Sequence, residues 1–249
     1  MIKPKSVLNY KCEAMVQNRE IAVKQLGLID YKAALAVQEA YYNAIIDRKC
    51  GRLTAQQATQ PSPASYLLFC QHPPVYTLGR GGGMDHLLVD PATLQAESIA
   101  LYHVNRGGAI TYHGPGQLVV YPIIDLELFF TDIHRYLRLL ETAVIETLAY
   151  FNIPSTRFPG LTGVWLPADQ TTKRCDRKIC AIGIKVSRWV TMHGLALNVN
   201  NDLAPFGNII PCGIAKAVTS MQQELNQAIS VMAVSDILEQ NILNKLNFV

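Results

Sequence analysis

The sequence has no apolar run long enough to cross a membrane as a helix. The first 19 residues also lack the apolar core of a secretory signal peptide. Charged residues make up only 16% of the 249 residues, against 49% hydrophobic ones, and the formal net charge is only +3. These values argue against disorder and against a dedicated nucleic-acid binder. We therefore expect a cytoplasmic globular protein that binds neither a membrane nor a nucleic acid.

The common motifs of metal and nucleotide sites are absent as well. The six histidines form neither HExxH nor HxH, and the six cysteines include no CxxC pair. We expect no metal site, and reduced thiols rather than a disulfide framework. The chain has no GxxxxGK[ST], and neither of its glycine clusters completes GxGxxG. The cluster at 80–83 (RGGG) could still cradle a phosphate, so these absences do not exclude ATP as a substrate.

The most unusual stretch in the chain is 106–117, RGGAITYHGPGQ, which lies between two apolar runs. It combines four glycines and a proline with several polar side chains. Glycine lets a backbone approach a ligand closely, and functional loops concentrate such residues. A plain hairpin turn needs few of them. We interpret the stretch as a binding loop that joins strands over 99–104 and 118–124.

The apolar spacing predicts a single α/β (or α+β) domain, with a central sheet flanked by helices and a smaller C-terminal part. Asp30 is a candidate N-cap for the first helix, and Thr131 or Asp132 for the second. The predicted strands are 21–28, 66–70, 99–104, 118–124, 163–166, 179–186 and 194–199, and the predicted helices are about 30–47, 131–151 and 235–246. Residues 1–16 are expected to be a loose extension.

Cys212 is the cysteine best presented for chemistry, because Pro211 and Gly213 place it on a tight turn. Cys70 and Cys180 lie in apolar strands and fit core packing. From the residues alone, core packing is an equal alternative for Cys212. A nucleophilic thiol must ionise and needs a base or cation nearby. The sequence leaves His113, His193 and Lys178 open as that partner.

Five motifs, in order along the chain, resemble those of the lipoyl (octanoyl) transferase family. The first is the Gly-rich stretch at 106–117, followed by Tyr121. The others are HPPVYTLG at 72–79, KIxxxG at 178–183, HGxALN at 193–198 and PCG at 211–213. The matches extend over roughly residues 21–221. Residues 51–63 and the RGGG cluster look longer than the family minimum, but these departures do not touch the motif residues.

The resemblance implies the fold of the biotin and lipoate protein ligases, a mixed sheet flanked by helices, with residues 17–249 as the catalytic domain. It also implies an acyltransferase without a cofactor of its own, since phosphopantetheine is carried by the donor, octanoyl-acyl carrier protein. The acceptor is a lysine on the lipoyl domain of a 2-oxoacid dehydrogenase complex or on the glycine-cleavage H protein. The family nucleophile falls on Cys212 and its partner on Lys178. We expect a monomer.

The residue types fit this chemistry. Lys178 would stabilise the thiolate of Cys212 and lower its pKa, and an acyl-cysteine would link the two transfer steps. Backbone N–H groups at 107–108 or near Cys212 would hold the oxyanion. His113 and His193 would then orient the substrate rather than act as the base.

The octanoyl chain needs a narrow apolar slot, and small residues would leave it room. The resemblance places the walls of this slot at Arg106, Gly107, Gly108, Ala109, Ile110, Thr111, Tyr112, His113, Ala181, Ile182, Gly183, Gly194, Leu195 and Ala196. Basic side chains would help to dock two acidic protein partners. The candidates for docking are Arg80, Arg106, Arg174, Arg177 and Lys185.

Two alternatives stay open. One is an ATP-dependent ligase of the lipoate or biotin type, which activates a free acid, and the RGGG cluster is only a faint match to the adenylate loop of biotin ligases. The other is a non-catalytic scaffold that binds acyl carrier protein. The presence of both Cys212 and Lys178 favours direct transfer over either alternative.

Overall fold

The computed structural model describes residues 19–52, 54, 62–171, 173–210 and 217–247. The predicted extension at 1–16 lies outside these residues. None of the helices in the described part of the chain combines the length and the apolar character needed to cross a bilayer.

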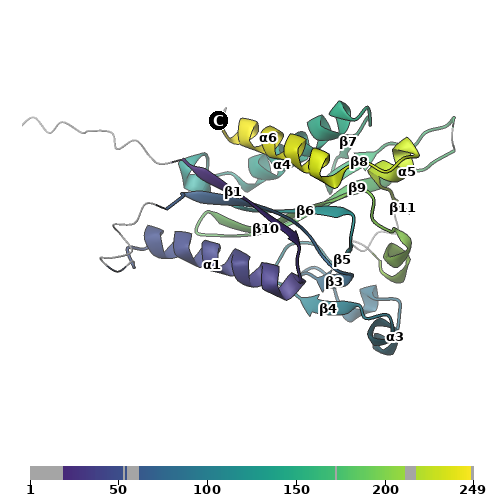
Figure 1. The fold of residues 1–249 in the computed structure, drawn as a ribbon, viewed down its shortest axis with the longest axis horizontal. Helices are drawn as coiled ribbons and strands as arrows, with labels where there is room; N and C mark the ends of the chain where they lie inside the picture. Colours follow the sequence, from purple (N-terminus) through teal and green to yellow (C-terminus); the bar gives the residue numbers. More distant parts are fainter. Residues whose placement is uncertain (1–18, 53, 55–61, 172, 211–216, 248–249) are drawn as a thin grey trace, which may run out of the picture.

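An eight-stranded mixed sheet forms the centre of the molecule (Figure 1), as the sequence predicted. β1 pairs with β2, and β11 with β9, in parallel, and the other neighbours are antiparallel. The strand order is β1 (Ile21–Leu28), β2 (Ser65–Gln71), β6 (Gln117–Ile123), β10 (Val190–Asn198), β9 (Arg177–Ser187), β8 (Leu161–Leu166) and β7 (Thr156–Phe158), with β11 (Ala217–Val218) beside β9.

A second, three-stranded sheet corrects one prediction. Its order is β4 (Ala100–His103), β3 (Val75–Leu78) and β5 (Ile110–His113). β5 lies inside the Gly-rich stretch, so 106–117 is not one continuous loop. Its residues, ITYH, are mostly β-branched or aromatic and favour a strand. β5 pairs antiparallel with β3, placing Thr111 opposite Thr77. The Gly-rich stretch is therefore divided into a turn before β5 and a turn after it.

Two long helices begin at the predicted caps. Asp30 accepts hydrogen bonds from the N–H groups of Lys32 and Ala33 at the start of α1 (Tyr31–Lys49), and Asp132 caps α4 (Ile133–Tyr150). The last helix, α6 (Val231–Asn247), begins before the predicted start near residue 235. The short strands β3, β5, β7 and β11 were not predicted. The short helices that were not predicted are η1 (Met84–His86), α3 (Pro91–Ala96), η2 (Leu126–Leu128), η3 (Ala204–Asn208) and α5 (Met221–Leu225).

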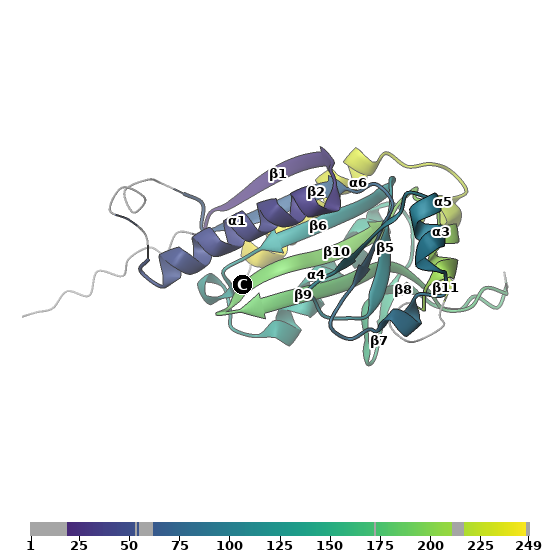
Figure 2. The same ribbon diagram turned by 90° about the horizontal axis from the view of Figure 1, so that it is seen from below.

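The two faces of the main sheet bury different partners. Figures 1 and 2 show α4 and α6 on one face, and α1 on the opposite face beside the three-stranded sheet. Alternation along β10 assigns its side chains accordingly. Leu195 and Leu197 pack in the core with α4 and α6, and Ala196 packs with α1. The α1 face, where α1 meets the small sheet, is the face that carries the candidate site.

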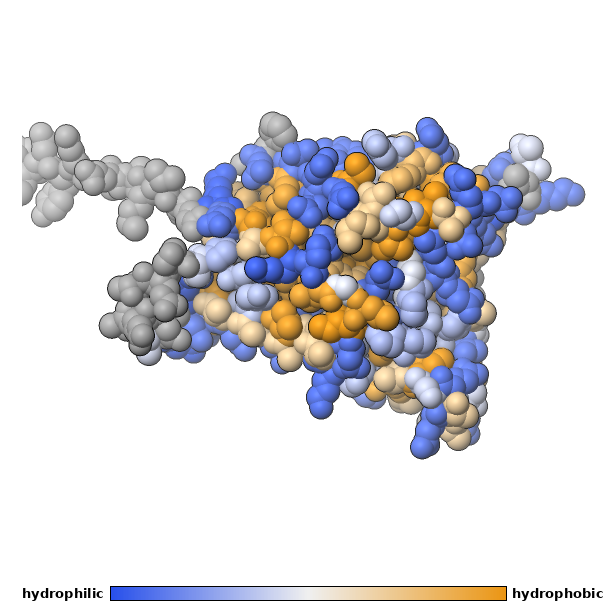
Figure 3. All heavy atoms as spheres, viewed as in Figure 1, coloured by the Kyte–Doolittle hydropathy of each residue, from blue (hydrophilic) through white to orange (hydrophobic). Residues whose placement is uncertain are grey.

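β1 stands at one edge of the described sheet, where an exposed ladder would invite pairing with another chain. A register irregularity between Gln25 and Gly27 and the exposed Lys24 both discourage such pairing. Leu28 is exposed at the end of this strand. On the face drawn in Figure 3, hydrophilic residues interrupt the apolar ones. This face therefore carries no single continuous apolar patch that would favour association with another chain.

Candidate active site

A cavity lies on the α1 face of the main sheet, between β9, β10 and the turn that precedes β5. Thirteen of the fourteen residues predicted to surround an acyl chain line it. These are Arg106, Gly107, Gly108, Ala109, Ile110, Thr111, His113, Ala181, Ile182, Gly183, Gly194, Leu195 and Ala196. Three motifs that are far apart in the sequence therefore meet at one hollow of the fold.

Tyr112, the fourteenth residue, does not line the cavity. Side chains alternate along β5, so Thr111 and His113 face one side and Tyr112 the other. The ring of Tyr112 packs against Tyr76 and Phe206, with ring centroids 5.3 and 5.5 Å away. Burial raises the pKa of its hydroxyl to about 12. Tyr112 is thus a core residue of the small sheet.

Two glycines have a different purpose from the one expected. A Cβ on Gly183 would lie 2.7 Å from the carbonyl oxygen of Gly107, and a Cβ on Gly194 would lie 2.1 Å from that of Val120. The missing side chains therefore let backbone segments approach each other, and the space they leave is filled by protein atoms. Both glycines line the cavity, as predicted, and a Cβ on either would meet backbone atoms of a neighbouring segment. Ala181 and Ala196 are the small side chains on this wall.

Arg106 is buried, with 8% of its surface exposed, and it fastens the Gly-rich turn to β3. Its Nη2 donates to the carbonyl oxygen of Thr77 at 2.6 Å and to the Thr77 hydroxyl at 2.9 Å. Its Nη1 donates to the carbonyl oxygen of Gly107 at 2.9 Å. The guanidinium therefore shapes the cavity wall, and its predicted role in docking an acidic partner was wrong.

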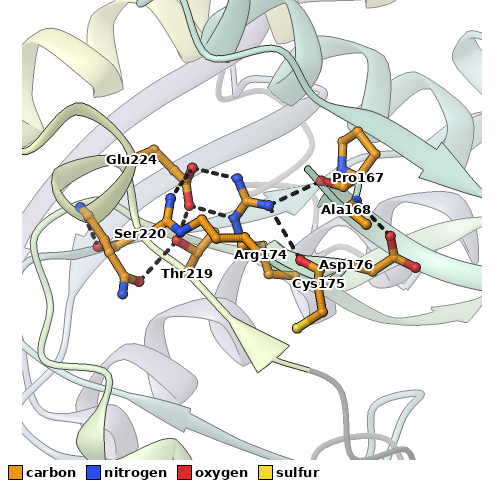
Figure 4. Close-up of polar contacts among 10 residues, drawn as sticks. Pro167, Ala168, Arg174, Cys175, Asp176, Thr219, Ser220 and Glu224 are labelled. Carbon is orange, nitrogen blue, oxygen red and sulfur yellow. Dashed lines mark hydrogen bonds and ion pairs between the residues drawn. The ribbon is translucent and has the colours of Figure 1, made fainter. Parts of the chain in front are cut away.

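A buried carboxylate engages two more of the arginines predicted to dock partners. Glu224 accepts hydrogen bonds from Arg177 Nε and Nη2 at 2.7 and 2.6 Å and from Arg174 Nη1 at 2.9 Å (Figure 4). The Thr219 hydroxyl also donates to it. Burial alone would raise the pKa of Glu224, but the hydrogen bonds from Arg177 and Thr219 outweigh it and lower the pKa. This cluster ties the start of β9 to α5, just beyond β11.

Lys178 is the second residue of β9 and lines the cavity. Its Nζ lies 4.5 Å from the centre of the Trp165 ring, a distance that suits a cation–π contact. Val218 of β11 pairs with it across the sheet. Cys212, its predicted partner, lies outside the described residues, so the predicted contact between the two stays a prediction.

The four cysteines in the described part of the chain are two buried and two exposed residues. Cys70 and Cys180 are buried, and burial raises the pKa of both thiols, which makes them inert core residues. Cys175 and Cys50 are exposed. Cys175 has no clamp of the kind that flanks Cys212 in the sequence.

His113 is held as one neutral tautomer. Gln117 Nε2 donates to Asn198 Oδ1 at 2.9 Å and to the Tyr112 carbonyl oxygen at 3.2 Å, so Gln117 Oε1 is the free acceptor. His113 Nδ1 lies 2.7 Å from that oxygen and must donate to it. The lone pair is then on Nε2. Burial, with His72 as the next cause, lowers the pKa of His113 to about 3.

Several residues of the cavity wall were missed by the sequence reasoning. Tyr31, the first residue of α1, has its ring 6.2 Å from that of His113 and nearly parallel to it. Tyr121 was noted only as the residue that follows the signature, yet its hydroxyl lies 2.7 Å from His72 Nε2. The other wall residues that were not predicted are Gln117, Val119, Asn198, Phe206 and Val218. Gln117, Tyr121 and Asn198 belong to the matched motifs, which could have marked them. The other missed residues lie outside those motifs, and no local pattern marks them.

The buried histidines predict a loss of stability in acid. The pKa of His193 is lowered to about 4 by burial, Arg106 and Lys185, and that of His113 to about 3. Between pH 6.5 and 4 these two histidines bind protons in the unfolded chain but stay neutral in the folded chain. The free energy of unfolding therefore falls as the pH falls. Each histidine should contribute a slope of about 1.4 kcal/mol per pH unit in this range.

Urea unfolding at a series of pH values measures this slope. His193→Asn removes one titrating ring, and asparagine tolerates the positive φ of this position. The slope between pH 6.5 and 4.5 should then decrease by about 1.4 kcal/mol per unit. An unchanged slope would mean that His193 is protonated in the folded protein.

Comparison with known proteins places these motifs in context. The model of the lipoyl protein ligase A/B catalytic domain family matches residues 30–243. The octanoyltransferase of Cytophaga hutchinsonii is 54% identical to the chain, over 90% of this chain and 92% of the relative. That of Bacteroides fragilis is 46% identical, over 88% of this chain and 95% of the relative.

Solved structures show the same fold at low sequence identity. A bipartite lipoate protein ligase from Thermoplasma acidophilum has a TM-score of 0.67 at 18% identity, covering 92% of this chain and 84% of the other. A lipoate-protein ligase A bound with ATP has a TM-score of 0.62 at 17% identity, covering 92% and 85%. These similarities confirm the predicted ligase-like architecture.

Proposed function

The chain belongs to the lipoyl protein ligase A/B catalytic domain family, and we propose that it transfers an octanoyl group from octanoyl-acyl carrier protein to a lysine of a lipoyl domain. The relatives that carry the name octanoyltransferase match over most of both chains, so an acyltransferase activity is the premise. The proposal adds the donor, the acceptor and a cysteine thioester as the intermediate.

One observation carries the proposal. Lys178 lines the same cavity as the Gly-rich turn before β5 and the alanine wall of β9 and β10. An apolar slot whose described wall carries the amine of Lys178 suits an acyl chain whose reactive carbon sits beside that amine. Cys212 stands five residues before Ala217 in the sequence, and β11, which begins there, pairs directly with the start of β9. This connectivity supports a Cys212 thiol within reach of Lys178.

The transfer takes place in two steps, acylation of Cys212 and then transfer of the acyl group to the acceptor lysine. The Cys212 thiolate attacks the donor carbonyl, the bond from carbon to pantetheine sulfur breaks, and the Lys178 ammonium gives that sulfur a proton. The amine of the acceptor lysine then attacks the acyl-cysteine. Neutral Lys178 takes a proton from this amine, and Cys212 leaves as a thiolate. A thioester is converted to an amide, so the transfer requires no ATP.

His113 and the turn before β5 supply the surroundings of this chemistry. His113 is neutral with its lone pair on Nε2, so it can accept a hydrogen bond in the cavity but carries no charge there. The backbone of Gly107 and Gly108 borders the same space. These groups orient the substrate, while Lys178 donates a proton in the first step and accepts one in the second.

A ligase reaction is the competing function, because the fold is shared with ligases that use ATP. Mass spectrometry separates the two. The protein is mixed with octanoyl-acyl carrier protein without ATP, and in parallel with free octanoate plus ATP. We expect an octanoyl adduct on the peptide that contains Cys212 in the first mixture only. Acylation only in the second mixture would establish a ligase. No acylation in either mixture would support a non-catalytic scaffold.

A further inference from the structure

The strand that carries Lys178 contains a bulge directly after it. On β8, Val164 is level with Cys180 of β9. The next residue, Trp165, is level with Lys178, so Ile179 is an extra residue in β9. Ile179 and Cys180 are both fully buried in the core that α4 and α6 cover. Consecutive residues of a regular strand point to opposite faces, so the extra residue reverses the alternation at this point.

The bulge aims the side chain of Lys178 at the cavity. Ala181, on the other side of the bulge, lines the cavity, and so does Lys178. In a regular strand, residues three positions apart point to opposite faces, so these two would be separated by the sheet. The extra residue brings both of them to the same face. Bulges often turn a side chain in this way beside an active site.

Gly163 and Glu141 stabilise the two strands in this shape. Gly163 has a φ of 112°, and a Cβ there would lie 2.5 Å from the carbonyl oxygen of Cys180 and 3.7 Å from Lys178 Cε. Its N–H donates to Glu141 Oε1 at 2.9 Å. Glu141 is a fully buried residue of α4, and its carboxylate is paired with two arginines. The glycine therefore lets β8 approach the bulge and leaves room for the stem of Lys178.

The ring of Trp165 lies where this backbone places the ammonium group. The Nζ of Lys178 is 4.5 Å from the centre of the ring. Trp165 is only 3% exposed, and Phe158 of β7 packs against it with the ring centroids 5.9 Å apart. A lysine side chain is a point charge on a flexible four-carbon stem, so a buried aromatic face restricts the positions that the charge can occupy.

We propose that Trp165 is a positioning residue of the acyl transfer, which holds the Lys178 ammonium where the leaving sulfur needs a proton. This inference rests on the proposed transfer and adds to it a residue that is not part of the described cavity wall. A group whose orientation is fixed before the reaction lowers the barrier of the chemical step. Loss of the ring should therefore lower kcat, whereas KM for the donor, which depends on the cavity wall, should stay the same.

Steady-state kinetics with octanoyl-acyl carrier protein and a lipoyl domain test this role. Trp165→Leu removes the aromatic face, and Trp165→Phe keeps one. Trp189→Leu is the matched control, because Trp189 is the other tryptophan of the chain and lies between β9 and β10, at the end of β9 opposite to Lys178. We expect kcat to fall about ten-fold in Trp165→Leu and about two-fold in Trp165→Phe. KM for the donor and the kcat of Trp189→Leu should each change by less than about two-fold.

Tryptophan fluorescence tests the contact without relying on catalysis. In a Trp189→Phe background, Trp165 is the one tryptophan that the chain retains. Lys178→Met keeps an unbranched side chain and removes the charge, so it should change the emission of Trp165. The same substitution in a Trp165→Phe background, where Trp189 emits, should have no effect.

Three results would overturn the proposal. They are a folded Trp165→Leu protein with the kcat of the wild type, equal losses of kcat in Trp165→Leu and Trp165→Phe, and an emission of Trp165 that does not respond to Lys178→Met. If Trp165→Leu does not fold, the fluorescence comparison decides the matter. A wild-type protein that transfers no octanoyl group would refute the proposed transfer, and this role with it, whereas the three results above would leave the transfer intact.

Discussion

Replacing Cys212 by serine is expected to reduce octanoyl transfer by about a thousand-fold or more. A cysteine thiol ionises far more readily than a serine hydroxyl, so the lysine that would hold Cys212 as a thiolate leaves a serine at this position protonated. The variant should also form no octanoyl adduct. The measurement is the initial rate of amide formation on a lipoyl domain, with octanoyl-acyl carrier protein as the donor.

Cys175→Ser is the matched control for this prediction. Cys175 is exposed, as a reactive thiol would be, but it lies in the polar loop before β9. Its replacement should change the rate by less than about two-fold. Equal losses in the two variants would show that the nucleophile is misassigned. A large loss in Cys175→Ser alone would assign the nucleophile to Cys175.

Local signals in the sequence were enough to predict much of the fold. Asp30 and Asp132 each precede an apolar helical repeat, and both cap the helices that follow. The apolar runs over 179–186 and 194–199 became the central strand pair β9 and β10. The motif matches predicted that Lys178, the Gly-rich stretch and the strand of Ala196 belong to one site, and all three line one cavity. These features depend on residues that are neighbours in the chain or on a family pattern.

The features that were missed depend on contacts between distant segments. β5 pairs with β3 inside a stretch whose glycines suggested only a loop. Side chains alternate between the two faces of β5, so the side chain of Tyr112 points away from the cavity and packs against Tyr76. A loop would not impose this alternation. His193 has a φ of 60°, and its N–H donates to Oε1 of Gln38, 155 positions earlier in the chain. No local pattern encodes such a bond, because side-chain packing on α1 decides it.

Gly194→Ala should destabilise the folded protein by about 3 kcal/mol or more. The added Cβ would lie 2.1 Å from the Val120 carbonyl oxygen and 2.6 Å from Pro122 Cδ, both on β6. β6 and β10 are neighbouring strands in the interior of the sheet, with cores on both faces, so neither backbone can move away cheaply. The same glycine follows the strained His193, and a shifted β10 would also disturb the cavity.

Gly207→Ala is the control for that loss, and urea unfolding measures both variants. Gly207 lies in η3, and a Cβ there meets no described atom within 4 Å. Its φ lies outside the left-handed region, so alanine should be neutral or stabilise by up to about 1 kcal/mol through the unfolded chain. A Gly194→Ala protein as stable as Gly207→Ala would mean that β10 relaxes around the added methyl group.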